Sequence, residues 1–375
     1  MKRIAIIGAG AAGLFAAKKL SECADTQVFV FEKSNKVGIK LRASGGGRAN
    51  IFNTNIQPEH YNNANFMQSV LARVSSETVR NEFTRIGLRL TVDEEGRVYP
   101  ATLFAATVVD TLLNNLGKNV RILCETPLQE LTSSNGKWLI NNEKTHYDNI
   151  ILATGSPAGM IAKKQENYNR HLQCIQLQTK PLQPSLSGFK IKKYPSFLAG
   201  CKSRAEISLF QDKKLIFKEI GEVIFKEDGI SGIVVLNASA HYNRLTDKNG
   251  CEISLNFLFD DPKIDISQYL QKFGSLTGIL HPKLCKLYEK NPFDLRDFRM
   301  AITGCYPLEF AQVSHGGIAV TEIDENFQLK KHSGIYSIGE MVDIVGVCGG
   351  YNLFFAFASA LIATEEIKRN FSKKI

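Results

Sequence analysis

Three glycines near the start of the chain, Gly8, Gly10 and Gly13, have the spacing Gly-x-Gly-x-x-Gly. They stand between a short apolar run and a helix-forming stretch. In that context the first glycine allows a tight turn and the second lets the backbone approach a pyrophosphate. The third lets the helix pack closely on the strand, and the first helical amides, at Ala11 and Ala12, face the phosphates. The pattern predicts a dinucleotide site, and an ordinary glycine-containing β–α turn is the alternative.

An acidic residue stands where such a site needs one. Glu32 closes the next apolar run, "QVFVFE", and Lys33 follows it. At the end of the second strand a carboxylate can accept hydrogen bonds from the adenosine ribose, and it disfavours a 2′-phosphate. The strand, the glycine turn, the helix and Glu32 together favour the dinucleotide interpretation.

Another stretch, "RASGGGRAN" from Arg42 to Asn50, has three consecutive glycines flanked by arginines and almost nothing apolar. It cannot build a core, and it has little helix or strand propensity. Its composition alone leaves open why so much bare backbone stands here. For Arg42 and Arg48, solvation at the surface is the alternative to a functional role.

Two later segments distinguish among dinucleotides. "ILATGS" (151–156) ends an apolar strand with small residues, so the backbone can approach a ligand at the carboxyl edge of the sheet. "GIYSIGEMVDIVGVCGGYNL" has a strand, then Glu340 and Asp343, then Gly349 and Gly350 before a helix. FAD, with its ribityl chain and three-ring head, needs this second anchor, whereas a nicotinamide domain does not. The late glycines could otherwise form a packing turn.

A helix that begins at these late glycines would suit a flavin. Its dipole would stabilise the negative charge that reduced flavin carries near N1 and the C2 oxygen. Asp343, near the ribityl chain or the phosphates, could accept hydrogen bonds from hydroxyl groups. We therefore predict FAD as the dinucleotide.

Apolar patterns indicate the elements that position these residues. "RIAII" and "QVFVFE" flank the helix-forming "AAGLFAAKKLSE", a β-α-β unit typical of a parallel sheet in an α/β fold. We expect a helix from about Phe66 to Ile86, a hairpin turning at Glu95-Gly96 and a helix ended by Gly117.

Beyond Pro181 and Pro184 the composition changes, and this change marks a boundary. The chain is strand-rich to about residue 261, helical over 262–303 and strand-forming again near 311–320. A long, mostly buried helix is expected at the C-terminus.

Composition excludes several classes of protein. The 375 residues carry a net charge of +9 without a long basic run or a nucleic-acid motif, so a nucleic-acid partner is not expected. None of the eight cysteines forms a Cys-x-x-Cys pair, so we expect no metal site. No apolar run has the length of a membrane span and no signal peptide is visible, so we expect a cytoplasmic protein.

Several motifs carry a resemblance to a known family: "GAGAAG", "KLRASGGGRANIFNTN", "GRVYPAT", "ILATGS", "GISG", "VSHGGIAVTE" and "GIYSIGEMVDIVGVCGGYNLFFAFASA". Over its full length the chain resembles the aminoacetone-oxidase-like FAD-dependent oxidoreductases, whose relatives include a dehydro-bile-acid reductase. It departs from them at Ala49, where the family usually has Cys, and at Ser156, where it usually has a second Gly. Ala49 argues against a thiol mechanism at that position.

The resemblance implies a role for the glycine-rich loop, which in this family runs along FAD. Lys40, Ser44 and the amides of Gly45 to Gly47 would meet phosphate and flavin oxygens, as a nest of peptide N–H groups does well. Asn50 would be at flavin distance, and Arg48 could neutralise charge or face the substrate. The cofactor-binding residues are then expected to be Gly8, Gly10, Ala11, Ala12, Gly13, Glu32, Lys33, Lys40, Leu41, Ser44, Gly45, Gly46, Gly47, Asn50, Leu128, Ala153, Thr154, Gly155, Gly339, Glu340, Asp343, Gly349, Gly350, Tyr351, Asn352 and Leu353.

The resemblance also implies the domain organisation. A Rossmann-like FAD-binding domain would comprise residues 1–184 and 333–375. An inserted β-rich substrate domain would comprise 185–261 and 304–332 and carry a small helical subdomain at 262–303. We expect "EDGISG" and "SHGGI" to approach the flavin, which makes His315 a candidate catalytic residue beside Arg48.

The expected function is hydride transfer between a small organic substrate and flavin N5. Oxygen or NAD(P)H as a transient co-substrate would complete the cycle, because no second Gly-x-Gly-x-x-Gly indicates a separate NAD(P)H domain. An amine oxidase and an enone reductase both remain open, as does an FAD-binding redox or nucleic-acid-associated protein that is not a metabolic enzyme. No motif indicates the substrate, the catalytic acid or base, or the oligomeric state.

Overall fold

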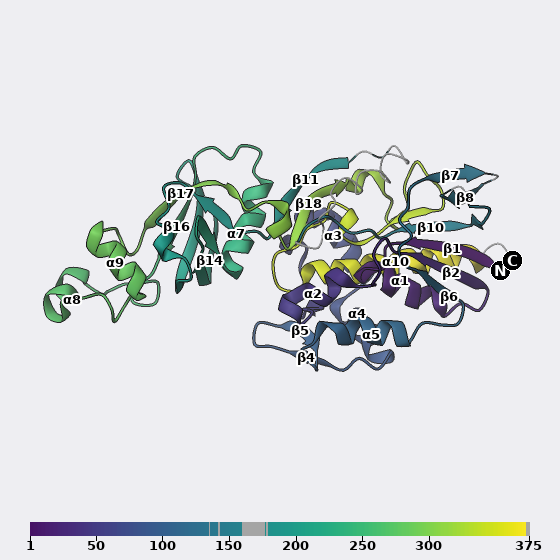
Figure 1. Cartoon of the computed structure of the whole chain (residues 1–375), viewed down its shortest axis with the longest axis horizontal. Helices are drawn as coiled ribbons and strands as arrows, with labels where there is room; N and C mark the ends of the chain where they lie inside the picture. Colours follow the sequence, from purple (N-terminus) through teal and green to yellow (C-terminus); the bar gives the residue numbers. More distant parts are fainter. Residues whose placement is uncertain (135, 142, 160–176, 178, 373–375) are drawn as a thin grey trace. The chain divides into compact units, whose positions relative to one another are not determined.

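The computed structural model describes residues 1–134, 136–141, 143–159, 177 and 179–372 (Figure 1). The chain forms two compact units, one of Met1–Leu182 with Ser314–Ile375 and one of Gln183–Val313. The segment 314–332, expected from the sequence in the inserted domain, therefore belongs to the first unit. The reason is local pairing, since Ile318 bridges Val342 and its carbonyl accepts the Asp343 amide at 2.8 Å.

The first unit is built on a parallel sheet with the strand order β19-β10-β1-β2-β6. All its neighbouring strands run parallel, as the β-α-β pattern predicts. Reading from β6, this is the 3-2-1-4-5 order of a Rossmann fold, which confirms the expected fold class. The strands are β1 (Lys2–Ile7), β2 (Thr26–Phe31), β6 (Val120–Leu123), β10 (Asn149–Leu152) and β19 (Ile335–Ser337).

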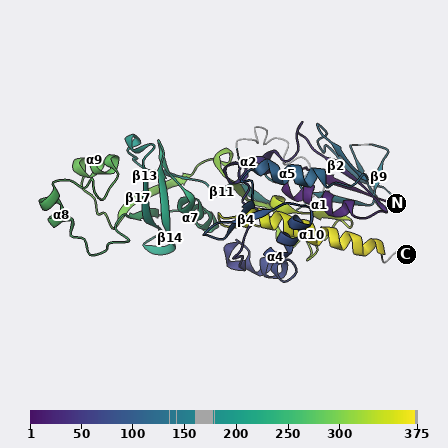
Figure 2. The same cartoon turned by 90° about the horizontal axis from the view of Figure 1, so that it is seen from below.

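Helices α1 (Ala11–Ser21), α5 (Ala105–Asn114) and α10 (Tyr351–Ser372) pack together beside this sheet (Figure 2). The ring of Phe15 on α1 lies 5.1 Å from that of Phe357 on α10, and both are almost fully buried. A single apolar core thus joins the first helix of the chain to the last, as the sequence predicts for the C-terminal helix.

A small antiparallel sheet also packs against the parallel strands. It consists of β7 (Leu131–Ser134), β8 (Lys137–Ile140) and β9 (His146–Tyr147). The ring of Tyr147 meets Phe29 edge-on at 5.6 Å.

Between β2 and β6 the chain forms several short elements besides α5. These are α2 (Ile39–Gly47), β3 (Phe52–Asn53), a short 3₁₀ helix (Pro58–His60), α3 (Ala64–Leu71), α4 (Ser76–Arg85), β4 (Leu90–Val92) and β5 (Arg97–Pro100). The expected hairpin is confirmed, and Gly96 takes the positive φ of 75° that its turn needs. The single helix expected from Phe66 to Ile86 is wrong, because Ser75 caps a new helix by accepting the Thr78 amide at 3.1 Å.

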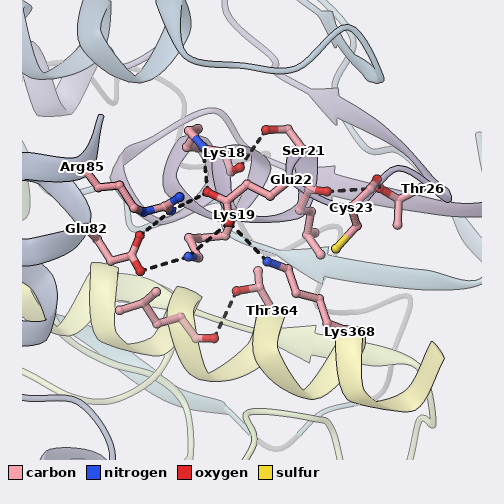
Figure 3. A network of polar contacts seen from close by, with 12 residues as sticks. Lys18, Lys19, Ser21, Glu22, Cys23, Thr26, Glu82, Arg85, Thr364 and Lys368 are labelled. Atoms are coloured by element: carbon pink, nitrogen blue, oxygen red, sulfur yellow. Dashed lines mark hydrogen bonds and ion pairs between the residues drawn. The ribbon is translucent and has the colours of Figure 1, made fainter. Parts of the chain in front are cut away.

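A cluster of ion pairs joins α1, α4 and α10 at the C-terminal end of α1, away from the glycine turn (Figure 3). Glu22 accepts a hydrogen bond from Lys18 at 2.7 Å and pairs with Lys19 at 3.3 Å. It also pairs with Arg85 of α4 at 2.5 Å and with Lys368 of α10 at 3.6 Å. The Glu22 carboxylate thus pairs with cations from three helices.

The second unit is a closed barrel with the strand order β12-β15-β14-β13-β16-β17 around its own apolar core, which supports the expected β-rich insert. The stretch "IVVLNAS", expected in a strand-rich region, lies in α7 (Ile233–Arg244), and β17 begins within the region expected to be helical. The region 262–303 also contains two helices, as expected: α8 (Ile266–Phe273) and α9 (Pro282–Lys290). The strands are β12 (Phe189–Ile191), β13 (Lys202–Gln211), β14 (Lys214–Phe225), β15 (Gly229–Ser231), β16 (Cys251–Asn256) and β17 (Phe298–Cys305).

The chain passes between the two units along β11 (Thr179–Ser185) and β18 (Val313–Ile318), which pair with each other. Within the described residues, no helix combines the length and the apolar character needed to cross a membrane.

Candidate functional site

The Rossmann turn joins β1 to α1 by close backbone packing. Gly8 has φ of 104°, and a Cβ there would lie 2.5 Å from the Ala153 carbonyl oxygen. A Cβ on Gly13 would lie 1.9 Å from the Gly8 carbonyl oxygen, so only glycine allows this approach of helix and strand. A Cβ on Gly10, by contrast, would meet no atom of the described residues within 4 Å. The turn is therefore closely packed at Gly8 and Gly13, whereas open space lies beside Gly10.

The open side of the turn is rich in hydrogen-bond donors. No side chain caps α1 at Gly10, and no acidic residue stands in its first turn, where Ala11 and Ala12 lie. Such amides and the helix dipole favour an anion. Glu32 lies beside the turn and accepts the Ala9 amide at 2.8 Å and the Ser34 amide at 2.9 Å. The neighbouring Lys33 is exposed.

The glycine-rich loop ends α2 in a left-handed turn. Gly45, Gly46 and Gly47 all have positive φ, and a Cβ on Gly46 or Gly47 would meet no described atom within 4 Å. Leu41 anchors the loop in the core, and the Ser44 hydroxyl donates to the Leu41 carbonyl at 2.7 Å. The loop thus presents bare peptide groups to open space, while its helical start differs from the irregular structure expected.

This loop meets the beginning of α10, which the sequence places 300 residues later. With its side-chain amide oriented to satisfy both partners, Asn50 accepts the Gly350 amide and donates to the Phe52 carbonyl, each at 3.1 Å. The Asn53 amide donates to the Gly349 carbonyl at 3.2 Å. The two glycine segments predicted to hold one cofactor are therefore adjacent in space.

Side chains around the start of α10 fix its entry loop. The Asn352 amide both accepts from the Gly346 amide at 2.9 Å and donates to the Gly346 carbonyl at 3.0 Å. Burial raises the pKa of Tyr61 well above its usual range, so its hydroxyl stays protonated and donates to the Tyr351 carbonyl at 3.0 Å. Burial also lowers the pKa of His60, whose ring lies 4.5 Å from that of Tyr351. Leu353 is partly buried against the core.

The carboxyl end of β10 supplies a third open segment. Gly155 has φ of 69° and open space beside it, and Ala153 and Leu128 are buried. The Thr154 amide faces the Met341 sulfur at 3.3 Å. Among the residues that the structure describes, the buried Thr154 hydroxyl has no hydrogen-bond partner. A polar group from a ligand would satisfy it.

Lys40 forms an ion pair that the sequence did not predict. Its ammonium lies 2.7 Å from Glu340, which belongs to the short 3₁₀ helix Gly339–Met341 that follows β19. The Ser156 hydroxyl donates to the same carboxylate at 2.7 Å and lies 3.3 Å from Lys40. The Ser314 amide donates to Glu340 at 3.1 Å. Ser156 stands where the resembled family usually has glycine, and its hydroxyl thus contacts both members of the Lys40–Glu340 pair.

Asp343 is only 3% exposed and is surrounded by donors. Its Oδ1 accepts from the Gly316 amide at 3.0 Å and the Asn62 amide at 3.2 Å, and lies 3.4 Å from His315 Nδ1. Its Oδ2 pairs with Lys180 at 2.8 Å. The structure therefore brings His315 to Asp343. No short-range sequence pattern indicated that Asn62 or Lys180 would contact Asp343, because both residues are distant from it in the sequence.

The two arginines of the loop lie at the surface. Arg42 pairs with Asp110 of α5 at 2.8 Å, and Arg48 is exposed at the end of α2. Ala49 is fully buried, so the position where the resemblance has Cys has no side chain in contact with solvent. Across the described part of the chain, no group of His, Cys, Asp and Glu is arranged to hold a metal ion.

These features fit FAD. A Cβ on Gly10, Gly46, Gly47 or Gly155 would meet no described atom within 4 Å, so bare backbone could face a cofactor at these positions, and the Thr154 hydroxyl lacks a partner within the described residues. Glu32 would hold the ribose, and the glycine-rich loop and the start of α10 would hold the remainder.

Comparisons with known proteins agree with this geometry. The family profile described as "HI0933-like protein Rossmann domain" matches residues 2–366. The chain is 28% identical to the 3-dehydro-bile acid delta(4,6)-reductase of Clostridium scindens, over 97% of this chain and 98% of that protein. It is 25% identical to the ribosomal RNA dihydrouridine synthase of Haemophilus influenzae, again over 97% and 98%. The same activity is named for a relative from Escherichia coli, 25% identical over 96% of this chain and 97% of that protein.

Among solved structures, the chain resembles the 3-ketosteroid delta1-dehydrogenase of Sterolibacterium denitrificans. The TM-score is 0.54 at 11% identity, and the match covers 99% of this chain and 100% of that one. This likeness supports the fold.

Proposed function

The chain belongs to the HI0933-like family of Rossmann-fold, FAD-dependent oxidoreductases, and we propose that it is a reductase of a carbon–carbon double bond conjugated with a carbonyl group. The observation that carries the FAD site is the adjacency of the two glycine segments through Asn50 and Gly350. The relatives support the choice of reaction. A delta(4,6)-reductase of a 3-oxo compound and a dihydrouridine synthase each saturate such a bond.

When bound, FAD supplies hydride transfer at N5. The residues of the chain would bind and orient it. The amides of α1 and of Gly45 to Gly47 would hold the pyrophosphate and neighbouring oxygens, and Glu32 the ribose. The first amides of α10 would favour negative charge on the reduced ring. NAD(P)H is the proposed reductant, docking transiently, because the sequence has no second Gly-x-Gly-x-x-Gly.

Reduced flavin tests the proposed reaction. The FAD-reconstituted protein would be reduced by NADH or NADPH without oxygen and mixed with cyclohexenone or a conjugated oxo-steroid. We expect the flavin absorbance to return as the saturated ketone forms. If the alkenes leave reduced flavin unchanged, and aminoacetone instead bleaches the oxidised flavin and yields hydrogen peroxide in air, the protein is an amine oxidase and the proposal is wrong.

Reduction of uracil in RNA is a second candidate. Two full-length relatives carry the dihydrouridine synthase name, and the net charge of +9 would favour a polyanion. Unmodified ribosomal RNA added to the reduced enzyme distinguishes the two candidates. Formation of dihydrouridine, with binding that weakens steeply as salt rises, would select RNA over a small molecule.

A further inference from the structure

Lys40, Ser156 and Glu340 form a triangle of polar contacts. The Lys40 ammonium lies 2.7 Å from Glu340 Oε2 and 3.0 Å from Oε1. The Ser156 hydroxyl accepts a hydrogen bond from Lys40 at 3.3 Å and donates one to Glu340 Oε1 at 2.7 Å. Each of the three side chains therefore contacts the other two.

The three side chains come from segments that are far apart in the sequence, and each segment borders the candidate FAD site. Lys40 stands at the start of α2, the helix that ends in the glycine-rich loop. Ser156 follows Gly155 beyond β10, and Glu340 lies in the 3₁₀ helix after β19. Because β10 and β19 are neighbours in the parallel sheet, the triangle joins the loop helix to the carboxyl ends of two adjacent strands.

Backbone amides fix the two oxygen-bearing corners of the triangle. The Ala158 amide donates to Ser156 Oγ at 3.2 Å, and the Ser314 amide donates to Glu340 Oε1 at 3.1 Å. Lys40 and the Ala158 amide can only donate to Ser156, so the single hydroxyl hydrogen points to the Glu340 carboxylate. The Ser156 hydroxyl thus uses both of its lone pairs and its hydrogen within this cluster.

The triangle also changes the role expected for Lys40, which the resemblance places at a phosphate. The ammonium faces both oxygens of the Glu340 carboxylate, and opposite charges at this separation largely cancel for a third group. The Lys40–Glu340 pair is therefore neutral as a unit. Its main contribution is to connect two segments of the site, while peptide amides remain the groups that favour an anion.

We propose that Ser156 is a positioning residue for the FAD site. Its hydroxyl holds Glu340 against Lys40, and the resulting bridge fixes the glycine-rich loop against the ends of β10 and β19. Glycine, usual at position 156 in the resembled family, has no side chain that could do this. A site whose segments are already held together loses less conformational freedom when it binds its ligand. The inference rests on the proposed FAD site and is independent of the substrate that the flavin reduces.

Removal of the hydroxyl tests the bridge. Since the backbone of Ser156 is not in the left-handed region, Ser156→Ala adds no strain. We expect the dissociation constant of FAD, measured by calorimetry on FAD-free protein, to rise about 10-fold, as for one lost hydrogen bond to a charged group. The matched control is Ser254→Ala in the barrel, where Ser254 donates to Asp297 at 2.5 Å and Asp297 pairs with Arg299. This variant loses the same kind of contact and should bind FAD as wild type does.

A double substitution separates a bridge from a direct contact with FAD. Lys40→Met removes the ion pair, and we expect it also to weaken FAD binding. If the hydroxyl acts through the bridge, Ser156→Ala should have little further effect in the Lys40→Met protein. A hydroxyl that touches FAD itself would weaken binding about 10-fold in both backgrounds, and that result would overturn the inference.

Hydrogen exchange without FAD reports the bridge itself. The Ser314 amide reports on Glu340, to which it donates, and the Ala49 amide reports on the glycine-rich loop, within which it donates. Both should exchange faster in Ser156→Ala than in wild type, and neither should change in Ser254→Ala. Unchanged exchange at both amides, or unchanged FAD affinity of Ser156→Ala, would overturn the inference while the FAD site stands. A wild type that binds no FAD overturns both.

Discussion

Gly46 and Gly87 offer a matched pair of substitutions for the FAD loop. Both have positive φ, 65° and 86°, and a Cβ on either would meet no described atom within 4 Å. Valine at either position costs about 1–2 kcal/mol of backbone strain. Only Gly46 lies in the loop that meets the start of α10. We expect Gly46→Val to purify without the yellow flavin absorbance and Gly87→Val to retain it.

The FAD content and the thermal midpoint of each variant, measured together, check this prediction. Similar thermal midpoints of the two variants without FAD would show that valine causes equal backbone strain at both positions. Loss of flavin from Gly46→Val alone would then show that Gly46 lies in the FAD site. Flavin retained by Gly46→Val would remove the loop from the cofactor site.

Some roles of single residues could be predicted from the sequence, and others could not. Gly8, Gly10 and Gly13 could be interpreted because their roles are set by backbone within a few residues. Asn62 and Lys180 could not, since their partner Asp343 is distant in sequence and a lone Asn or Lys carries no local signal. Lys40 was expected to meet a phosphate, and its pairing with Glu340 depends equally on tertiary structure.

At the scale of elements, one carboxylate makes the packing of α1, α4 and α10 depend on pH. Burial alone would raise the pKa of Glu22, but hydrogen bonds from Lys18 and Arg85 and the charge of Lys19 lower it to about 2 from 4.5. Because the folded pKa is the lower one, the stabilisation is present above pH 4.5 and is lost as the pH falls toward 2.

Glu22→Gln should therefore destabilise the protein by about 1 kcal/mol at neutral pH, after allowance for solvent screening, and by less near pH 3. Urea unfolding at both pH values measures the difference. Glu77→Gln is the control, because that carboxylate is 65% exposed and pairs with Arg80 of its own helix. An equal loss for Glu22→Gln at both pH values would contradict the role of its charge.

Elements also divide into those that local sequence determines and those that packing determines. The β1–α1–β2 unit and α10 follow from their apolar patterns. The helix α7 was not expected, since "IVVLNAS" is β-branched and favours a strand, and packing against β14 overrides that preference. The break between α3 and α4 depends on the Ser75 cap within an otherwise continuous apolar pattern.

At the scale of the whole molecule, each unit closes its own core. The barrel of Gln183–Val313 buries Leu209 completely among its own strands, and the Rossmann unit buries Leu361 on α10 at 1% exposure. Every residue of the proposed FAD site belongs to the Rossmann unit. A ligand that binds only the folded form stabilises it by RT ln(1 + [L]/Kd), about 2.7 kcal/mol at 100 times Kd. FAD should therefore stabilise one unit and leave the other unchanged.

Calorimetry of the whole chain should accordingly resolve two transitions, of which excess FAD raises only one. Leu361→Ala should lower the FAD-sensitive transition and Leu209→Ala the other, because each leaves a cavity that costs about 2–5 kcal/mol in its own core. The two variants make the same chemical change at equally buried sites, so each serves as the control for the other. A single transition that FAD and both variants shift alike would show that the two cores unfold as one cooperative unit, and the assignment of FAD stabilisation to the Rossmann unit alone would then be wrong.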